Sequence, residues 1–311
     1  MTYLASFSQH ALHVPVELQP LTAEICQQLS DKLSPQQLTV FEHPQFALSA
    51  FKVCACSQFI TDSWLRQPDL IPELVNTGDL FSSEYRDGYL TRLQSKSFAN
   101  EADLAKQLRQ FRRREMVRIA WRDLAGWADL NETLSDLTAL AEACIQTALD
   151  FFYQQACQRW GTPTLANGTP FNIVVLGMGK LGAWELNYSS DIDLIFAYAE
   201  EGVLNSKKEI SYGEFFTRIC RSLVKALDEI TVDGFVFRTD VRLRPFGDSG
   251  PLIMTFDGME NYYLTQAREW ERYAMIKARQ VAGDFDTGKQ LAALIKPFVY
   301  RRYLDYGAFE E

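Results

Sequence analysis

The chain of 311 residues is 47% hydrophobic and 13% aromatic, so it can bury a sizeable core and form two domains, or one domain with helical extensions. A formal net charge of -9 and a pI near 5.0 make nucleic acid a poor default partner, because an acidic surface repels a phosphate backbone. No stretch approaches the ~18 apolar residues of a membrane span, and the first residues lack the basic and apolar segments of a secretory signal, so we expect a soluble, cytoplasmic protein that meets no membrane.

The first half of the chain is predicted to be helical, because apolar residues recur there at helical spacing. Pro68 and Pro72 are expected to end the second helix, and Gly161 the fourth. The four segments are residues 18–33, 46–65, 101–124 and 134–160.

The helix predicted over 101–124 combines an apolar stripe with six arginines. Most of the arginines fall outside the stripe, so we expect a solvated face whose arginines extend their charged ends into water. Contact with a phosphate or a partner is the alternative. The stripe consists of Leu104, Leu108, Phe111, Val117 and Trp121, and the arginines are Arg109, Arg112, Arg113, Arg114, Arg118 and Arg122.

Cysteines and histidines form no convincing metal-binding pattern. The six cysteines include no C-x-x-C pair and are expected to be buried, reduced thiols. Cys54 and Cys56 could share a metal, but no histidine or acid lies close in sequence to complete the shell. The three histidines are interpreted as surface or packing residues: His10, His13 and His43.

From residue 171 the pattern changes to short strands separated by turns. The predicted strands are FNIVVL (171–176), DIDLIFAY (191–198) and FVFRTDVRLRP (235–245). Ser211 and Glu214 form a capping box that opens a helix over 212–230. A long helix is predicted over 255–280, and another begins at Gly283-Asp284.

The segment between the first two strands begins like a dinucleotide-binding turn. Gly177, Gly179 and Gly182 spell G-x-G-x-x-G after an apolar run. Only eight residues separate Gly182 from Asp191, which is too few for the helix of a Rossmann unit. The acids also precede the second strand instead of following it. We therefore disfavour a nicotinamide cofactor.

Asp191 and Asp193 favour a metal site instead. Residues i and i+2 of a strand point the same way and lie roughly 6.6–6.8 Å apart, so both carboxylates project from one face. Such a pair can bracket an ion that prefers oxygen ligands, as Mg²⁺ does. The same D-x-D pattern also occurs in ordinary turns and helix caps, which is the simpler alternative.

The predicted third strand supplies another acid, Asp240. Its neighbours on one face are arginines, which suit phosphate oxygens because they bind them bidentately. The glycine turn, with Lys180 inside it, offers backbone N–H groups for phosphate. A solvent-facing strand is the alternative, but the combination favours nucleotidyl transfer assisted by one or two metal ions. The face consists of Val236, Arg238, Asp240, Arg242 and Arg244.

The run from Gly177 to Leu194 closely resembles the signature of glutamine synthetase adenylyltransferases, which attach AMP to a tyrosine of glutamine synthetase and remove it. The matching pattern is G-x-G-K-L-G-x-x-E-L-N-x-x-S-D-I-D-L. The likeness covers roughly residues 100 to 311, and Thr239 stands where an apolar residue is expected. Three further blocks resemble the family: LRQFRRREMVRIAWRDLAGWADL (108–130), FRTDVRLRPFGDSGPL (237–252) and EWERYAMIKARQVAGD (269–284).

The resemblance implies an α+β fold with a nucleotidyltransferase-type mixed sheet. We expect a helical amino-terminal region over 1–165, a catalytic domain over 166–283, and the start of a further helical region over 284–311 in a longer protein. The family has two nucleotidyltransferase halves; the first uses orthophosphate to remove AMP as ADP, and the second adds AMP from ATP. One motif after about 170 residues of helix fits the removing half. Addition of AMP and a non-catalytic nucleotide-binding module are the alternatives.

The resemblance also implies residue roles and partners. Asp191, Asp193 and Asp240 would be catalytic and hold Mg²⁺ or Mn²⁺. For Lys277 and Arg279, an ordinary helix-end role is an equal alternative. The expected partners are adenylylated glutamine synthetase, phosphate, ADP and a PII-type regulatory protein. The expected nucleotide- and phosphate-binding residues are Gly177, Gly179, Lys180, Ser190, Arg242, Arg244, Lys277 and Arg279.

Overall fold

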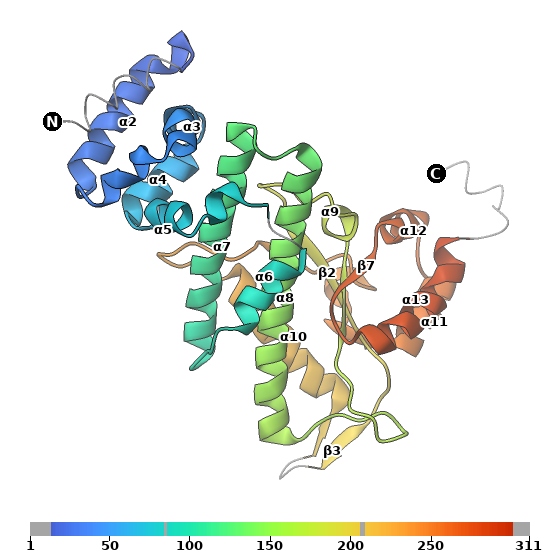
Figure 1. Ribbon diagram of the computed structural model, residues 1–311. Coiled ribbons are helices and arrows are strands. Elements are labelled where there is room, and N and C mark those ends of the chain that lie inside the picture. The colour runs from blue at the N-terminus through green and yellow to red at the C-terminus, as the bar shows by residue number, and fades with distance from the viewer. Residues whose placement is uncertain (1–13, 84–85, 206–208, 301–311) are drawn as a thin grey trace. The chain divides into compact units, whose positions relative to one another are not determined.

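The computed structural model describes residues 14–83, 86–205 and 209–300 (Figure 1). Contacts divide the chain into two compact units, one formed by residues 1–85 and 110–137 and the other by 86–109 and 138–311. The domain boundaries predicted after residues 165 and 283 do not coincide with this division. They remain predictions. Within the described ranges, every helix falls short of the combination of length and apolarity needed to cross a membrane.

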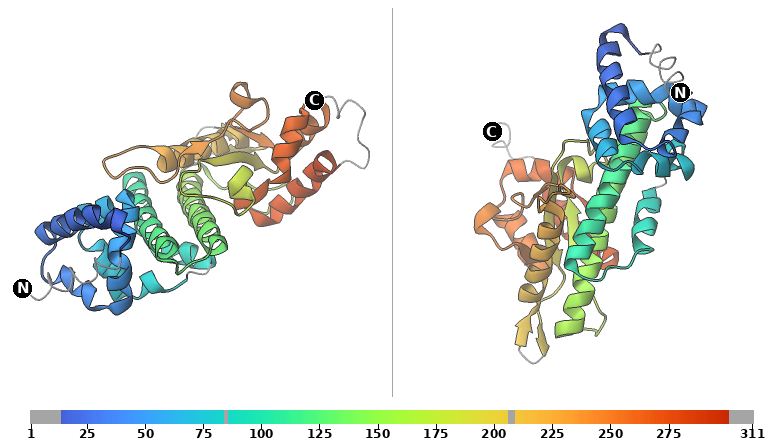
Figure 2. Two further views of the ribbon diagram at one scale, coloured as in Figure 1. Left: turned by 90° about the horizontal axis from the view of Figure 1, so that it is seen from above. Right: turned by 90° about the vertical axis from the view of Figure 1, so that its left-hand side faces the viewer.

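The first unit is helical. Its helices α2 to α5 lie side by side and stay grouped in both further views (Figure 2). Two long helices, α7 (Glu101–Ala125) and α8 (Leu130–Trp160), are divided between the units. The other elements are η1 (Val16–Leu18), α2 (Gln19–Lys32), η2 (Gln37–Glu42), α3 (Pro44–Cys56), α4 (Gln58–Arg66), α5 (Leu70–Asn76) and η3 (Asp79–Phe81).

The predicted helix over 46–65 is in fact two helices, α3 and α4. They separate at Ser57, whose backbone is extended. The Ser57 hydroxyl caps the second helix by accepting the Ile60 N–H. Pro68 lies just after the end of α4, as predicted, whereas Pro72 does not end a helix. It lies in the first turn of α5, where a missing N–H costs no helical hydrogen bond.

An aromatic cluster forms the core of the first unit. The rings of Phe46 and Trp121 stack with centroids 5.0 Å apart, and Trp64 packs edge-on against Phe46 at 5.9 Å. The indole N–H of Trp121 donates to the Ser49 hydroxyl at 3.0 Å, so its one polar group is satisfied. The whole apolar stripe predicted on α7 is buried, which confirms that part of the prediction.

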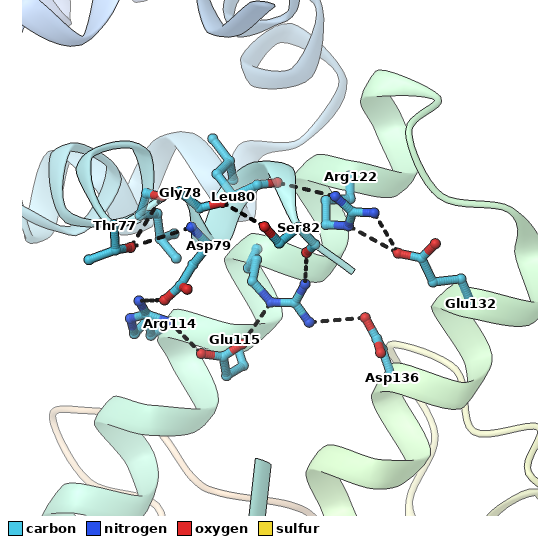
Figure 3. Close-up of polar contacts among 12 residues, drawn as sticks. Thr77, Gly78, Asp79, Leu80, Ser82, Arg114, Glu115, Arg122, Glu132 and Asp136 are labelled. Carbon is cyan, nitrogen blue, oxygen red and sulfur yellow. Dashed lines mark hydrogen bonds and ion pairs between the residues drawn. The ribbon is translucent and has the colours of Figure 1, made fainter. Parts of the chain in front are cut away.

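The predicted solvent exposure of the α7 arginines is wrong for Arg109, Arg113, Arg118 and Arg122, all of which are buried. Arg118 is 1% exposed, and its guanidinium pairs with Glu115 at 2.8 Å and Asp136 at 3.0 Å. Figure 3 shows these carboxylates approaching from two helices. Charged side chains are tolerated inside a protein when they are paired in this way.

The same arginines connect α7 to the segment around η3. Arg118 donates to the Ser82 carbonyl at 3.1 Å, and Arg122 donates to the Leu80 carbonyl while pairing with Glu132 at 2.7 Å (Figure 3). Arg114 pairs with Asp79 at 2.5 Å. Carbonyl groups that helical hydrogen bonding leaves unsatisfied therefore find donors in buried guanidinium groups.

The second unit is built around a mixed five-stranded sheet. Its strand order is β5-β2-β1-β7, with β6 also pairing β2. The elements are α6 (Arg86–Gln94), β1 (Val174–Gly177), α9 (Gly179–Gly182), β2 (Ile192–Tyr198), β3 (Val203–Asn205), β4 (Glu209–Ser211), α10 (Tyr212–Asp228), β5 (Thr239–Asp240), η4 (Gly247–Ser249), β6 (Ile253–Thr255), α11 (Phe256–Thr265), α12 (Glu269–Ile276), β7 (Arg279–Gly283) and α13 (Phe285–Val299).

The central strands β1 and β2 are nearly continuous apolar runs, as expected for strands covered on both faces. Helices α11 and α13 contact each other and lie beside the sheet at the red end of the chain (Figure 1). Two predicted caps are confirmed. The Ser211 hydroxyl accepts the Glu214 N–H at the start of α10, and the Asp284 carboxylate accepts the Asp286 and Thr287 N–H groups at the start of α13.

The helix predicted over 255–280 is interrupted once and ends too early to reach residue 280. It breaks after Thr265, restarts as α12, and ends before β7, which pairs antiparallel with β1. Backbone pairing with β1, together with burial of Val281 and Ala282, outweighs the helical pattern of the residues before them. The sequence pattern therefore did not predict β7, which forms one edge of the sheet.

The predicted packing role of His43 holds, whereas the predicted burial of the cysteines is wrong for Cys26, Cys56 and Cys157. His43 stacks on Phe81 with ring centroids 4.2 Å apart, whereas His10 and His13 lie outside the described residues. All six cysteines are described, and no disulfide joins them. Burial raises the pKa of the Cys54 thiol to about 12, so it stays protonated near neutral pH. Only three are buried: Cys54, Cys144 and Cys220.

Replacing Arg118 with methionine removes a cationic partner from Glu115, which is 0% exposed, and from Asp136. Because the carboxylates stay buried, we expect the free energy of unfolding to fall by about 3 kcal/mol in chemical denaturation. Lys289→Gln is the matched control, since its pair with Asp286 is exposed on both sides and screened by water, so its loss should leave the free energy of unfolding nearly unchanged. Equal losses in the two variants would contradict a structural role for the buried pair.

Candidate active site

The three predicted acids lie at the start of β2 and on β5 beside it. Strands β2 and β5 are parallel, and their register places Asp193 opposite Asp240. Paired residues of adjacent strands project from the same face of a sheet, so these two carboxylates share one side. Asp191 precedes β2 by one residue and belongs to the same electrostatic group, because its charge also acts on Asp193.

The electrostatics of the three acids differ. Burial, and then the charges of Asp240 and Asp191, raise the pKa of Asp193 above its ordinary value. A hydrogen bond from the Arg242 guanidinium lowers the pKa of Asp240. Asp191 pairs with Arg238 at 2.6 Å, and both side chains are about half exposed. Asp193 is thus the crowded acid, and its two neighbours each have an arginine.

The predicted strand over 235–245 is wrong in its length, because β5 contains only two residues. Asp240 ends it by accepting the backbone N–H of Arg242 at 2.8 Å, a local bond that turns the chain. The predicted alternation also fails before the strand, since Val236 and Phe237 are both buried. The acid itself is nevertheless in register with Asp193.

The two predicted phosphate-binding arginines after β5 have different surroundings. The Arg242 side chain is 71% exposed. Its Nε and Nη2 donate to Oδ2 of Asp240 at 2.8 and 2.5 Å. The Arg244 side chain is 11% exposed and donates to the Val241 carbonyl at 2.8 Å and to the Gly250 carbonyl at 3.4 Å. Arg244 thus holds its own loop together, and contact between it and phosphate stays a prediction.

The glycines of the predicted phosphate turn have separate steric roles. A Cβ on Gly177 would lie 2.6 Å from a methyl group of Val281, and one on Gly182 would lie 1.8 Å from the Lys277 carbonyl oxygen. Only Gly179 has a positive φ, of 54°, and a Cβ there would lie 3.7 Å from a carboxylate oxygen of Asp193. Gly177 and Gly182 are therefore required for packing, whereas Gly179 borders the acids.

The other predicted phosphate-binding residues lie within α9 or follow it in the sequence. Lys180 is exposed within the turn. The Ser190 hydroxyl donates to the Asn187 side chain at 2.6 Å and so supports the segment before β2. Lys277 pairs with Glu185 at 2.6 Å. Arg279 donates to the carbonyls of Leu181 and Gly182 at 3.0 and 2.9 Å, so it bonds the end of α9 and not the end of the helix in which it was predicted to lie.

The acids have the right chemistry for a hard divalent cation, since carboxylate oxygens are the ligands that Mg²⁺ and Mn²⁺ prefer. Within the described residues, no group of three or more His, Cys, Asp or Glu side chains is arranged around one metal position. The cause is visible in the ion pairs, because Arg238 and Arg242 engage the carboxylates of Asp191 and Asp240. Binding of a cation by all three acids therefore requires those arginines to release them.

Two features of the site escaped the sequence interpretation. Arg238 pairs with Asp191 and also donates to the Ser189 carbonyl at 2.6 Å, so it orders the segment that carries the first acid. Trp184, at an unassigned position of the motif, has a positive φ of 61° and lies directly after α9. The alternating arginines around Asp240 pointed toward the first feature, whereas no sequence signal indicated the second.

Comparison with known proteins finds a match to one protein family. The model of the family described as glutamate-ammonia ligase adenylyltransferase matches residues 48–293. A relative from Nitrosococcus oceani, named bifunctional glutamine synthetase adenylyltransferase/adenylyl-removing enzyme, is 52% identical over 83% of this chain and 27% of its own length. Relatives with the same name from Methylococcus capsulatus and Pseudomonas putida are 48% and 45% identical over 86% and 96% of this chain, and 28% and 31% of their own lengths. The chain thus spans less than a third of these relatives.

Replacing Asp193 with asparagine removes the crowded carboxylate. A folded-state pKa above the ordinary value means that the ionised form costs stability, and that this cost disappears as the pH falls through the folded-state pKa. We expect Asp193→Asn to raise the Tm at about pH 7.5 in a metal chelator, and the difference to shrink by about pH 4.

Asp240→Asn is the matched control with the opposite sign. The pKa of Asp240 is lowered by Arg242, so its ionised form stabilises the fold above the unfolded-state pKa, and this contribution is lost as the pH falls through the folded-state pKa. We expect Asp240→Asn to lower the Tm under the same conditions. Thermal denaturation curves that shift in the same direction for both variants would contradict this account of the site.

Proposed function

Because the chain belongs to the glutamate-ammonia ligase adenylyltransferase family, we propose that it removes AMP from an adenylylated tyrosine of glutamine synthetase, using orthophosphate and releasing ADP. The observation that supports a transfer site is the register of Asp193 with Asp240 beside Gly179. The names of the relatives supply the protein substrate and the removing activity as one of two.

The proposed reaction exchanges one phosphorus–oxygen bond for another. An oxygen of orthophosphate attacks the phosphorus of the tyrosine-bound AMP, and the bond from that phosphorus to the phenol oxygen breaks. The products are ADP and unmodified tyrosine, whose phenolate takes a proton from solvent. A phenol has a pKa of about 10, so its oxygen leaves without strong acid assistance.

The residues of this chain position the groups that react. Arg242, exposed at the edge of the site, would bind orthophosphate when it releases Asp240. The backbone around Gly179 and Lys180 would approach the phosphoryl oxygens, since a residue without a side chain permits close contact. Positioning and electrostatics of this kind supply most of the rate in phosphoryl transfer.

Asp191, Asp193 and Asp240 are the proposed ligands of Mg²⁺ or Mn²⁺. When bound, the cation would offset negative charge on the transferring group. The raised pKa of Asp193 is consistent with a site that needs a positive charge, because three acids are gathered there against their mutual repulsion. This crowding also disfavours a non-catalytic nucleotide-binding module, which has no need for it.

Addition of AMP from ATP is the second candidate, because the names of the relatives carry both activities. The choice of removal rests on the position of this single motif within the family pattern. A PII-type regulatory protein is a further proposed partner, and it rests on the family resemblance alone. The two reactions are separated by substrate: adenylylated target with phosphate for removal, unmodified target with ATP for addition.

The first test uses adenylylated glutamine synthetase, Mg²⁺ and phosphate. We expect the wild-type chain to form ADP, and Asp193→Asn to form none, because an amide is a weaker ligand than a carboxylate. Asp286→Asn, which replaces an exposed carboxylate on α13, is the control and should keep full activity.

Metal binding is measured separately from turnover. Titration calorimetry with Mn²⁺ should show binding to the wild-type chain and to the Asp286→Asn control, and none to Asp193→Asn. Binding that survives in Asp193→Asn would remove this acid from the proposed ligand set, whatever the activity.

The second test concerns orthophosphate. We expect Arg242→Ala to raise the KM for phosphate by roughly tenfold or more, with a smaller effect on kcat, since one charge-assisted contact is lost. Arg218→Ala is the matched control, because Arg218 is also exposed and paired with a carboxylate, Glu214 on α10. An unchanged KM for phosphate in Arg242→Ala would exclude the proposed role.

A further inference from the structure

We propose that Trp184 and the two arginines that contact its ring, Arg86 and Arg279, are positioning residues that hold the glycine turn against the acids. This inference rests on the proposed function of the site and names residues that act through α9. All of them lie in the second unit.

Two guanidinium groups contact the indole ring of Trp184. The centre of the Arg86 group is 3.9 Å from the ring centroid, and that of Arg279 is 4.4 Å away. These distances are within the range of cation–π attraction. Arg86 comes from the start of α6 and Arg279 from the start of β7, so the ring joins two elements that are distant in sequence.

The backbone of Trp184 is held in an unfavourable conformation. Its φ of 61° is rare for a residue with a bulky side chain. Such a conformation persists where surrounding contacts enforce it, and it is concentrated at functional sites. Backbone bonds that close the end of α9 accompany this conformation, from the Trp184 N–H to the Leu181 carbonyl at 3.4 Å and from the Glu185 N–H to the Lys180 carbonyl at 2.8 Å. Trp184 directly follows Ala183, the residue that caps α9, and the two guanidinium groups contact its ring.

Arg279 connects the ring to the turn. Its Nε donates to the Gly182 carbonyl at 2.9 Å, and its Nη2 donates to the Leu181 carbonyl at 3.0 Å. The same guanidinium pairs with the Glu142 carboxylate on α8. The Arg279 guanidinium therefore donates to the last carbonyls of α9, contacts the Trp184 ring and pairs with a carboxylate on α8.

The other contacts of α9 leave it little freedom on this side. The Cα of Gly182 lies so close to the Lys277 and Gly177 carbonyls that a Cβ would come within 1.8 and 2.4 Å of their oxygens. On its other side, Gly179 borders Asp193. A shift of α9 away from Arg279 would therefore change the distance between the turn and the acids.

A second tryptophan in the same unit provides a matched control. Trp160, at the end of α8, also contacts two guanidinium groups, those of Arg159 at 4.6 Å and Arg218 at 5.4 Å. Its ring packs against Phe215 of α10 and none of its recorded contacts involves α9. Loss of this stack should perturb local packing in the same way without reaching the glycine turn.

The first measurement is amide hydrogen exchange of residues 178–183 in the wild-type chain and in Arg279→Met, Trp184→Ala and Arg218→Met. We expect faster exchange of these amides in the first two variants and no change in the third. Trp184→Phe keeps an aromatic face and should stay close to wild type, which separates loss of the stack from loss of the fold. Unchanged exchange in Arg279→Met and Trp184→Ala would overturn the anchoring role.

The second measurement is steady-state removal of AMP. We expect Arg279→Met and Trp184→Ala to lower kcat by about 10- to 100-fold, with a smaller change in the KM for phosphate, because misplaced groups weaken the transition state more than ground-state binding. Arg218→Met and Trp184→Phe should stay within about threefold of wild type. Faster exchange without a loss of kcat would overturn the positioning role.

The two measurements also separate this inference from the proposed function. If the wild-type chain forms no ADP, the proposed removing activity fails, and hydrogen exchange still decides whether the stack anchors α9. If the wild-type chain is active but all variants retain its kcat, the proposed function stands and the positioning role falls.

Discussion

The site depends on one constraint: the backbone pairing of β2 with β5 holds Asp193 and Asp240 side by side although their charges repel. Ladder hydrogen bonds fix register to the residue, because a slip by one position would turn each side chain to the opposite face. The pairing itself is only two residues long, so it depends on the rest of β2, which is buried between β1 and β6. The stability of the apolar sheet thus offsets the cost of gathering the acids.

Arginines serve two opposite purposes in this chain. On α7 four of the six are buried, and Arg118 is enclosed by the carboxylates and carbonyls that it satisfies. At the site they are exposed, so the Arg238 and Arg242 pairs are screened by water and can exchange partners at small cost. Burial, and not residue type, decides which guanidinium groups form the scaffold and which remain available to a phosphate.

The sequence predicted features that depend on local chemistry. The α7 stripe, the caps at Ser211 and Asp284 and the strands β1 and β2 follow from periodicity and side-chain hydrogen bonding. The strand β7 did not, because residues 279–283 are extended only through pairing with β1, far away in sequence. The length of β5 was mispredicted for a similar reason, since the turn after Asp240 depends on a side-chain bond that alternation does not reveal.

The acids themselves were accessible from sequence, because D-x-D spacing and an acid among arginines are visible without a structure. Their partners were not, since the pairing of Asp191 with Arg238 joins residues separated by a helix and three strands. The buried arginines were misjudged because periodicity locates a face of a helix but does not show that Glu115 and Asp136 will be buried beside it.

The G-x-G-x-x-G pattern shows why a motif must be interpreted through packing. In a dinucleotide-binding turn the glycines let the backbone approach a pyrophosphate and a neighbouring strand. Here Gly177 and Gly182 approach other parts of this protein, the Val281 side chain and the Lys277 carbonyl, and only Gly179 lies beside the acids. The pattern therefore arises from a need to pack α9 closely against β1 and β7, two paired strands that the turn must touch while it faces Asp193. A single residue then borders the proposed reaction, and the rest of the turn serves to keep that residue in place.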